Sequence, residues 1–212
     1  MPCKDDRDGE CFFDTNAPAN QGKMKQEMLE EFLADNKTTI LERWFELTVD
    51  TYPADSRKFL NSRGNRFANP VGASISDGLE GVYDLLVKSG GAEPHEFVTF
   101  LDEIVRIRAV QDFSPANAVG FVFLLKKAAR EAIGKEIRES RLSEQVVAFE
   151  SRIDSLALLS FNIYMQCREK LFEIRATEIR NRTSRILERA CQKYGMPQEW
   201  MAPEDGSKNS VT

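Results

Sequence analysis

The stretch that decides the fold is residues 94–130, PHEFVTFLDEIVRIRAVQDFSPANAVGFVFLLKKAAR. Its pattern predicts two helices that meet at a tight corner, DFSP, at residues 112–115. Ser114 is a residue type that caps helices, and Pro115 suits the first helical position, where no N–H is needed. At about 100° per residue, the apolar residues of the first helix share one face. Arg108 falls in the middle of that face, so the sequence predicts a buried guanidinium.

A buried guanidinium costs several kcal/mol unless it is paired and hydrogen-bonded. Gln111 and Asp112 follow Arg108 at helical spacing and return to its side, and the loop RFANPVG contributes further polar groups. The predicted polar cluster, and candidate site for a small anion, consists of Arg66, Asn69, Arg108, Gln111 and Asp112. Two interpretations stay open. Arg108 binds a carboxylate or other anion bidentately, or it is a structural residue satisfied by Asp112, Gln111 or backbone carbonyls.

Residues 143–194 contain neither Gly nor Pro and predict one very long helix. Apolar residues recur along it at alternating spacings of three and four, which is typical of a helix that packs on a partner helix. The residues predicted to serve a dimer mate or partner are Phe149, Ile153, Leu156, Ile163, Cys167 and Ile174. Beyond Ile174 the surface is rich in arginine interleaved with glutamate, which indicates a solvated helix or a surface for a partner.

The remaining sequence divides into a disordered N-terminal extension (1–23), one helical domain (24–194) and a flexible tail (195–212). The helix expected at residues 71–89 carries Ser74, Gly78 and Gly81 on one strip, which indicates either close helix–helix contact or a groove. No segment predicts a β-strand. The expected fold is an all-α, globin-like helical bundle with a long C-terminal helix.

Composition narrows the function classes. The chain is 42% hydrophobic and 30% charged, with a net charge of −5, which fits a soluble globular domain and argues against a general nucleic-acid binder. No apolar run is long enough to span a membrane, and the acidic N-terminus lacks a secretory h-region, so a cytoplasmic location is expected.

The side chains that catalysis or metal binding needs are scarce. With one histidine (His95) and four scattered cysteines, a metal site has few ligands to draw on, and no cofactor is expected. No nucleophile–base pair or phosphate-binding loop is present, so the chain is not expected to be an enzyme.

The runs RFANPVGASISDGLEGVYDLL and LDEIVRIRAVQDFSPANAVGFVFLLK resemble the N-terminal domain of RsbR/RsbRD-type co-antagonist proteins, the sensor half of stressosome-like stress-response regulators. The similarity spans roughly residues 40–194. It implies a non-haem, globin-like, all-helical homodimer in signal transduction. In that family the domain usually precedes a STAS domain or a histidine kinase, whereas this chain ends shortly after the long helix and resembles a stand-alone form.

The leading hypothesis is a non-enzymatic cytoplasmic sensor or signal adaptor. It would act through a homodimer and an unknown protein partner, without nucleic acid, and in association with a membrane complex rather than spanning the membrane. One alternative is a haem- or gas-binding globin, for which His95, Tyr164 and Cys167 are the available ligands. The other is a purely structural adaptor of a larger redox complex.

Overall fold

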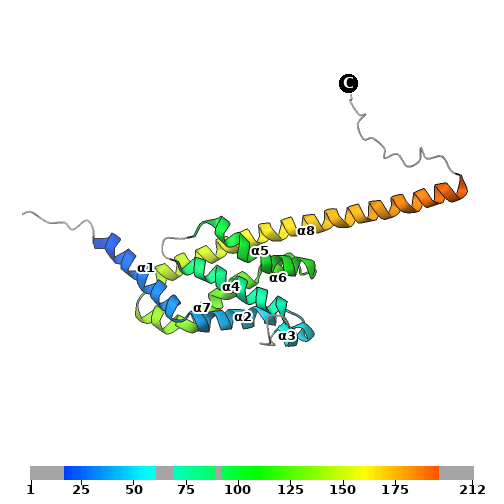
Figure 1. The fold of residues 1–212 in the computed structure, drawn as a ribbon. Helices are drawn as coiled ribbons and strands as arrows, with labels where there is room; N and C mark the ends of the chain where they lie inside the picture. Colours follow the sequence, from blue (N-terminus) through cyan, green and yellow to red (C-terminus); the bar gives the residue numbers. More distant parts are fainter. Residues whose placement is uncertain (1–16, 61–68, 89–91, 196–212) are drawn as a thin grey trace, which may run out of the picture.

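A computed structural model describes residues 17–60, 69–88 and 92–195, and within these ranges the chain is all helical (Figure 1). The helices are α1 (Ala17–Asp35), α2 (Lys37–Asp50), α3 (Ala54–Leu60), α4 (Pro70–Val87), α5 (Pro94–Val110), α6 (Pro115–Val119), α7 (Phe121–Glu139) and α8 (Ser143–Tyr194). No strand occurs among the described residues. The prediction of an all-α fold with a long C-terminal helix is therefore confirmed.

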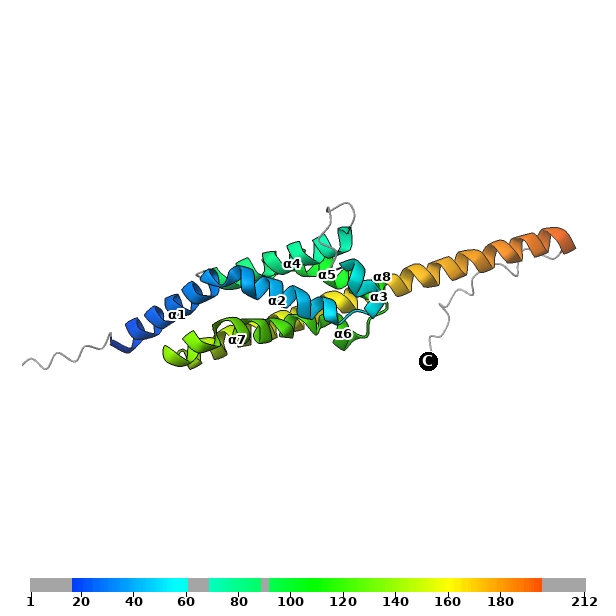
Figure 2. The ribbon, with the colours of Figure 1, turned by 90° about the horizontal axis from the view of Figure 1, so that it is seen from below.

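Helix α8 is the element on which the bundle is assembled. Its N-terminal half packs on α5, α6 and α7, while α4 covers α5 and α2 covers α7. The C-terminal half continues past the other helices as a projecting rod (Figures 1 and 2). Trp44 of α2 is fully buried, and its indole N–H donates to the Phe121 carbonyl at 2.7 Å, which ties α2 to the start of α7.

Local capping sets where the central helices begin. The Asn69 side chain accepts from the Gly72 N–H at 2.9 Å with Pro70 at the first turn of α4, and Ser114 Oγ accepts from the Asn117 N–H at 3.3 Å ahead of α6. Both caps agree with the sequence pattern. One difference is that the helix after Ser114 is divided at Gly120 into α6 and α7.

The glycine strip of α4 is a site of close helix contact. A Cβ built on Gly78 would lie 2.8 Å from Ile104 Cγ1 and 3.1 Å from the Phe100 carbonyl oxygen of α5. A Cβ on Gly81 would overlap the Phe100 ring. Of the two interpretations of this strip, the structure supports close packing of α4 on α5.

One prediction at the N-terminus needs correction. Helix α1 begins at Ala17, so residues 17–23 of the expected disordered extension are helical. Pro18 lies in the first turn of α1, where its missing N–H is tolerated, and the helix runs on into the apolar period that starts near Met28. Within the described ranges, no helix combines the length and apolar character that crossing a membrane requires.

Candidate functional site

Arg108 is fully buried at the centre of the bundle, as the periodicity of α5 predicts. Its Nη1 donates to the Asn117 carbonyl of α6 at 2.8 Å. Its Nη2 donates to the Thr48 carbonyl at 3.2 Å and to Thr51 Oγ1 at 2.9 Å, at the end of α2. One side chain on α5 therefore links the C-terminal end of α2 to α6.

Three aromatic rings enclose the guanidinium. Its Cζ atom lies 4.8 Å from the ring centroid of Tyr52 and 5.1 Å from those of Phe113 and Phe121. Tyr52 and Phe113 also meet edge to face at 5.0 Å. The faces of aromatic rings carry negative potential, so they stabilise a cation in a space from which water is excluded. We call Arg108, Tyr52, Phe113 and Phe121 the arginine cage.

No carboxylate pairs with Arg108 among the described residues; its partners are neutral oxygens and rings. Its Nε also lacks a hydrogen-bond partner within the described chain. Burial lowers the pKa of Arg108, and neighbouring Tyr52 counteracts part of that shift. The cage therefore holds a charge whose desolvation is only partly compensated.

The cage is joined to α8 through the turn at residues 111–114, which we call the corner. Helix α5 ends there in a Schellman arrangement: Asp112 has a left-handed φ of 58°, and the Phe113 N–H donates to the Arg108 carbonyl at 3.2 Å. From α8, the Tyr164 hydroxyl donates to the Phe113 carbonyl at 2.7 Å, and Arg168 Nη1 donates to Asp112 Oδ1 at 2.8 Å. The corner is thus held by Arg108 on one side and by α8 on the other.

The four described residues of the predicted cluster do not gather in one place. Asn69 caps α4 and donates to the Leu60 carbonyl at 2.9 Å. Gln111 and Asp112 are exposed, and Asp112 pairs with Arg168 instead of Arg108, so the interpretation with Asp112 or Gln111 as partner is wrong. The interpretation with backbone carbonyls matches the observed bonds. Arg66 lies outside the described residues.

A groove of about 800 Å³ lies between α2 and α4, and none of its lining residues belongs to the cage. Its apolar floor includes Leu41, Phe45 and Leu79, and Asn69 lies on its wall. The carboxylates at its rim are paired in part, since Glu80 meets Lys37 at 2.9 Å. The predicted entry point for a signal therefore falls into two places, a groove beside Asn69 and the closed cage around Arg108.

Helix α8 has two apolar rows, and the predicted partner row is mostly the inner one. Phe149, Ile153, Leu156 and Ile163 are buried within this chain, Cys167 is half-buried, and Ile174 is 54% exposed. An outer row carries Leu158, Phe161 and Met165, whose exposed fractions are 71%, 41% and 48%. We call these three residues the outer face. Sequence periodicity alone did not single out this row, because both rows follow helical spacing.

The side chains considered for haem do not converge. His95 is exposed in the first turn of α5, the Tyr164 hydroxyl is bonded to the Phe113 carbonyl, and Cys167 packs on the core. Among the described residues no cluster of His, Cys, Asp and Glu has the composition of a metal site. Sequence reasoning missed the residues that α2, its C-terminal end and α8 contribute to the cage and the corner. They lie far from Arg108 in the chain, and no local pattern marks them: Thr48, Thr51, Tyr52, Tyr164 and Arg168.

Comparison with known protein families gives one match. Residues 38–179 match the model of the RsbT co-antagonist protein rsbRD N-terminal domain. This range covers α2 to most of α8 and includes every residue of the arginine cage and the corner. No curated protein and no solved structure matches the chain. A globin-like topology therefore stays a prediction.

Proposed function

We propose a function from the premise that this chain belongs to the rsbRD N-terminal domain family of RsbT co-antagonist proteins. The family supports a regulatory role in stress signalling rather than a catalytic one. In our proposal the chain is a cytoplasmic signal adaptor that acts by protein–protein contact and whose output element is α8.

The observation that carries this proposal is the position of the corner. It touches the buried charge through Phe113 and Arg108, and it touches α8 through Tyr164 and Arg168. From residue 172 to residue 189 every residue of α8 is exposed, and the C-terminal part of α8 projects from the body of the bundle (Figure 1). A change in the packing of α2, α5 or α6 around Arg108 would therefore move the part of α8 from which the projecting segment extends. Coupling of this kind needs a contiguous packed network, and the cage, corner and α8 form one.

This coupling of the cage to α8 through the corner, which we call the relay, can be tested by a double-mutant cycle. Arg108→Met and Tyr164→Phe both act on the corner, so we expect their effects on the free energy of unfolding to couple by about 0.5 kcal/mol or more. Tyr83→Phe is the matched control, because it also removes one buried hydroxyl, which donates to the Leu33 carbonyl at 2.7 Å away from the corner. Its combination with Arg108→Met should be additive. Additivity of both pairs would disprove the relay.

We further propose that the outer face forms a homodimer. It offers three large, exposed apolar side chains on one side of a rigid helix, and a symmetric dimer would bury the same patch on both copies. The dimer would place two α8 helices side by side and give the adaptor a paired output.

Sedimentation equilibrium of Phe161→Glu/Met165→Glu tests this interface. We expect the wild-type protein to have the mass of two chains and the variant that of one. The control is Val98→Glu/Val110→Glu, which adds the same charges at exposed apolar positions of α5. A wild-type monomer, or an undisturbed dimer in the outer-face variant, would refute the interface.

The anion hypothesis for Arg108 stays a prediction, and the observed bonds favour the structural role, since both Nη atoms already donate to protein oxygens. Thermal melts in chloride, sulfate and acetate at matched ionic strength separate the two. We expect no selective shift in Tm. A rise with one anion that Arg108→Met abolishes would establish an anion site at the cage instead.

A further inference from the structure

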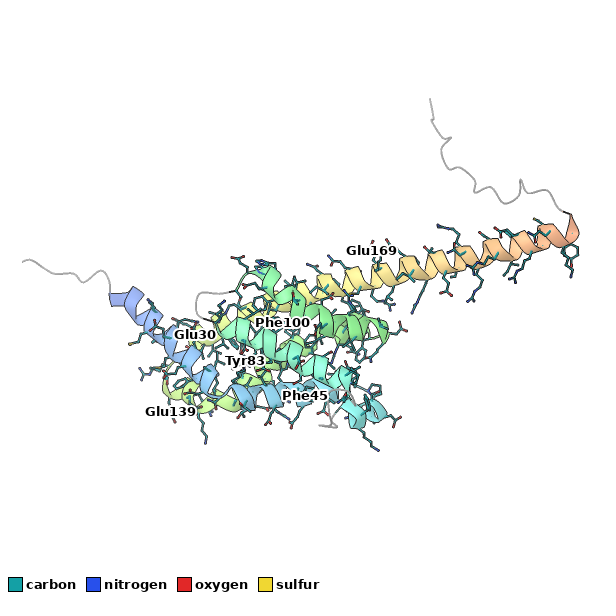
Figure 3. All side chains as sticks on the ribbon, viewed as in Figure 1. Glu30, Phe45, Tyr83, Phe100, Glu139 and Glu169 are labelled. Carbon is teal, nitrogen blue, oxygen red and sulfur yellow. The ribbon has the colours of Figure 1, made fainter. Side chains whose placement is uncertain are left out.

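Among the described residues, no other helix packs on residues 172–189 of α8. Every residue from 172 to 189 is exposed, and the side chains there project freely beyond the point labelled Glu169 (Figure 3). We call residues 172–190 the arm. An isolated helix gains little stability from propensity alone, and an amphipathic face normally requires a packing partner.

The arm carries a coiled-coil seam. Alternating steps of four and three residues align Phe172, Ala176, Ile179, Thr183, Ile186 and Ala190 on one line. The three large residues, Phe172, Ile179 and Ile186, are exposed by 74%, 66% and 61%. The residues between them are small, which leaves room along the seam for large side chains of a facing helix.

Arginines flank this seam. One side presents Arg175, Arg182 and Arg189 at seven-residue intervals, and the other side presents Glu173, Arg180 and Leu187. These flanks are the e and g positions, which meet the flanks of the facing helix and set partner choice. Four of the six flanking residues are therefore arginines and one is acidic.

A second copy of the arm does not complement this charge pattern. In a parallel, in-register pair, Arg175 of one copy faces Arg180 of the other; in an antiparallel pair the arginine rows face each other. Like charges at these positions are destabilising and disfavour that partner. Leu158 and Met165 of the outer face lie on the same heptad line as Phe172, so a homodimer through the outer face fits this charge pattern where the two α8 helices are antiparallel or diverge before Phe172, which keeps the two arms apart.

We propose that the arm is the docking site for a helix of a different protein, one with large apolar residues at its core positions and Asp or Glu on both flanks. The apolar seam supplies affinity, and the arginines select an acidic partner over basic or self-pairing ones. This inference deepens the proposed function, because it names the chemistry of the partner that receives the output of α8.

Two synthetic helices test the proposal with the full-length protein. Both peptides are about four heptads long with Ile at a and Leu at d; one has Glu at every e and g position and the other has Lys. Binding is followed by fluorescence anisotropy of the labelled peptide. We expect the Glu peptide to bind at least about tenfold tighter than the Lys peptide, with a difference that shrinks as salt is raised.

Arg182→Glu/Arg189→Glu is the diagnostic variant, and Lys170→Glu/Arg185→Glu is its control. Each changes the net charge equally and removes one ion pair within α8, Arg182–Glu178 at 3.2 Å or Lys170–Glu173 at 3.6 Å. Of the four substituted residues, only Arg182 and Arg189 flank the seam. We expect the diagnostic variant to lose the preference for the Glu peptide by about tenfold and the control to keep most of it.

Equal binding of both peptides, no binding of either, or equal effects of the two variants would overturn the proposal. Binding to phosphatidylglycerol vesicles or random-sequence duplex DNA, with the same dependence on Arg182 and Arg189 but no binding of the Glu peptide, would also overturn it in favour of those surfaces. The mass of the diagnostic variant separates this result from the proposed function. If it remains a dimer while peptide binding is lost, the dimer proposal stands independently.

Discussion

The stabilities of the variants Arg108→Lys, Arg108→Met and Arg108→Ala should not follow the chemical similarity of the new residue to arginine. We expect Arg108→Met to lie closest to the wild type, and both Arg108→Lys and Arg108→Ala to be clearly less stable. The reason is that Arg108 is a buried charge without a carboxylate, so removing the charge relieves a desolvation cost of several kcal/mol.

The stabilising free energy that Arg108→Met loses can be estimated from the contacts of Arg108. Without the guanidinium, the Thr48 carbonyl still accepts from the Thr51 N–H and hydroxyl at 3.2 and 2.6 Å, whereas the Asn117 carbonyl loses the 2.8 Å bond from Arg108. One orphaned carbonyl costs about 1–3 kcal/mol, and each ring contact contributes about 0.5–2 kcal/mol. These terms nearly offset the relief of desolvation, so Arg108→Met should change the free energy of unfolding by about 1.5 kcal/mol or less.

Ala and Lys fail for different reasons. Arg108→Ala adds a cavity, at about 2–5 kcal/mol for a long side chain, so it should fall about 2–4 kcal/mol below Met. Arg108→Lys retains a charge whose single ammonium cannot reproduce the planar fork that reaches both α2 and α6. It should therefore be less stable than Arg108→Met by about 2 kcal/mol or more.

Urea unfolding followed by circular dichroism, at one fixed protein concentration because self-association would add to apparent stability, measures these differences. The refuting result is Arg108→Lys at or above the stability of Arg108→Met. That outcome would mean that the aromatic rings and carbonyls compensate the buried charge fully, so that the cage is a stabilising site for any cation.

Three further predictions follow from the same structure. Gly78→Ala should destabilise the protein by about 1–3 kcal/mol, because the new Cβ would meet Ile104 and the Phe100 carbonyl. Gly134→Ala in α7, where a Cβ has nothing within 4 Å, should stabilise the protein by about 0.5–1 kcal/mol. Thermal melts compare the two variants, and a change in stability of the same sign for both would contradict the packing of α4 on α5. Arg168 holds the pKa of Asp112 below its ordinary value, so the ion pair stabilises the protein above the unfolded pKa of about 3.9 and loses this effect as the pH falls through the folded pKa. The difference in urea stability between the wild type and Asp112→Asn should therefore disappear in acid. A difference that does not change with pH would argue against the ion pair. Burial raises the pKa of Tyr83, so the contribution of its neutral phenol to folding stability is complete below the unfolded pKa of about 10 and is lost as the pH rises toward the folded pKa. Tyr83→Phe should therefore reduce the loss of stability at alkaline pH. Identical alkaline stability profiles for the wild type and the variant would rule out a buried phenol.

By itself the sequence determined the all-helical class, the caps at Asn69 and Ser114 and the burial of Arg108, but it marked neither the break at Gly120 nor the start of α1 at Ala17. Helix ends depend on nearby groups, such as the Asn69 and Ser114 side chains that accept from N–H groups three residues ahead, and the burial of Arg108 follows from the apolar period of its own helix. These interactions span a few residues, so a linear pattern contains all the information needed to predict them.

Only the tertiary structure decided the partners. The bonds of Arg108 to Thr48 and Thr51 span 60 and 57 residues, and the left-handed turn at Asp112 directs its carboxylate to α8 instead of back to Arg108. The choice between the two apolar rows of α8 was also made by packing, because Ile153 and Leu158 have similar side chains and only the positions of α5 and α7 bury the first and expose the second. Contacts between distant segments depend on how helices are placed in space, and periodicity within one helix does not specify that placement.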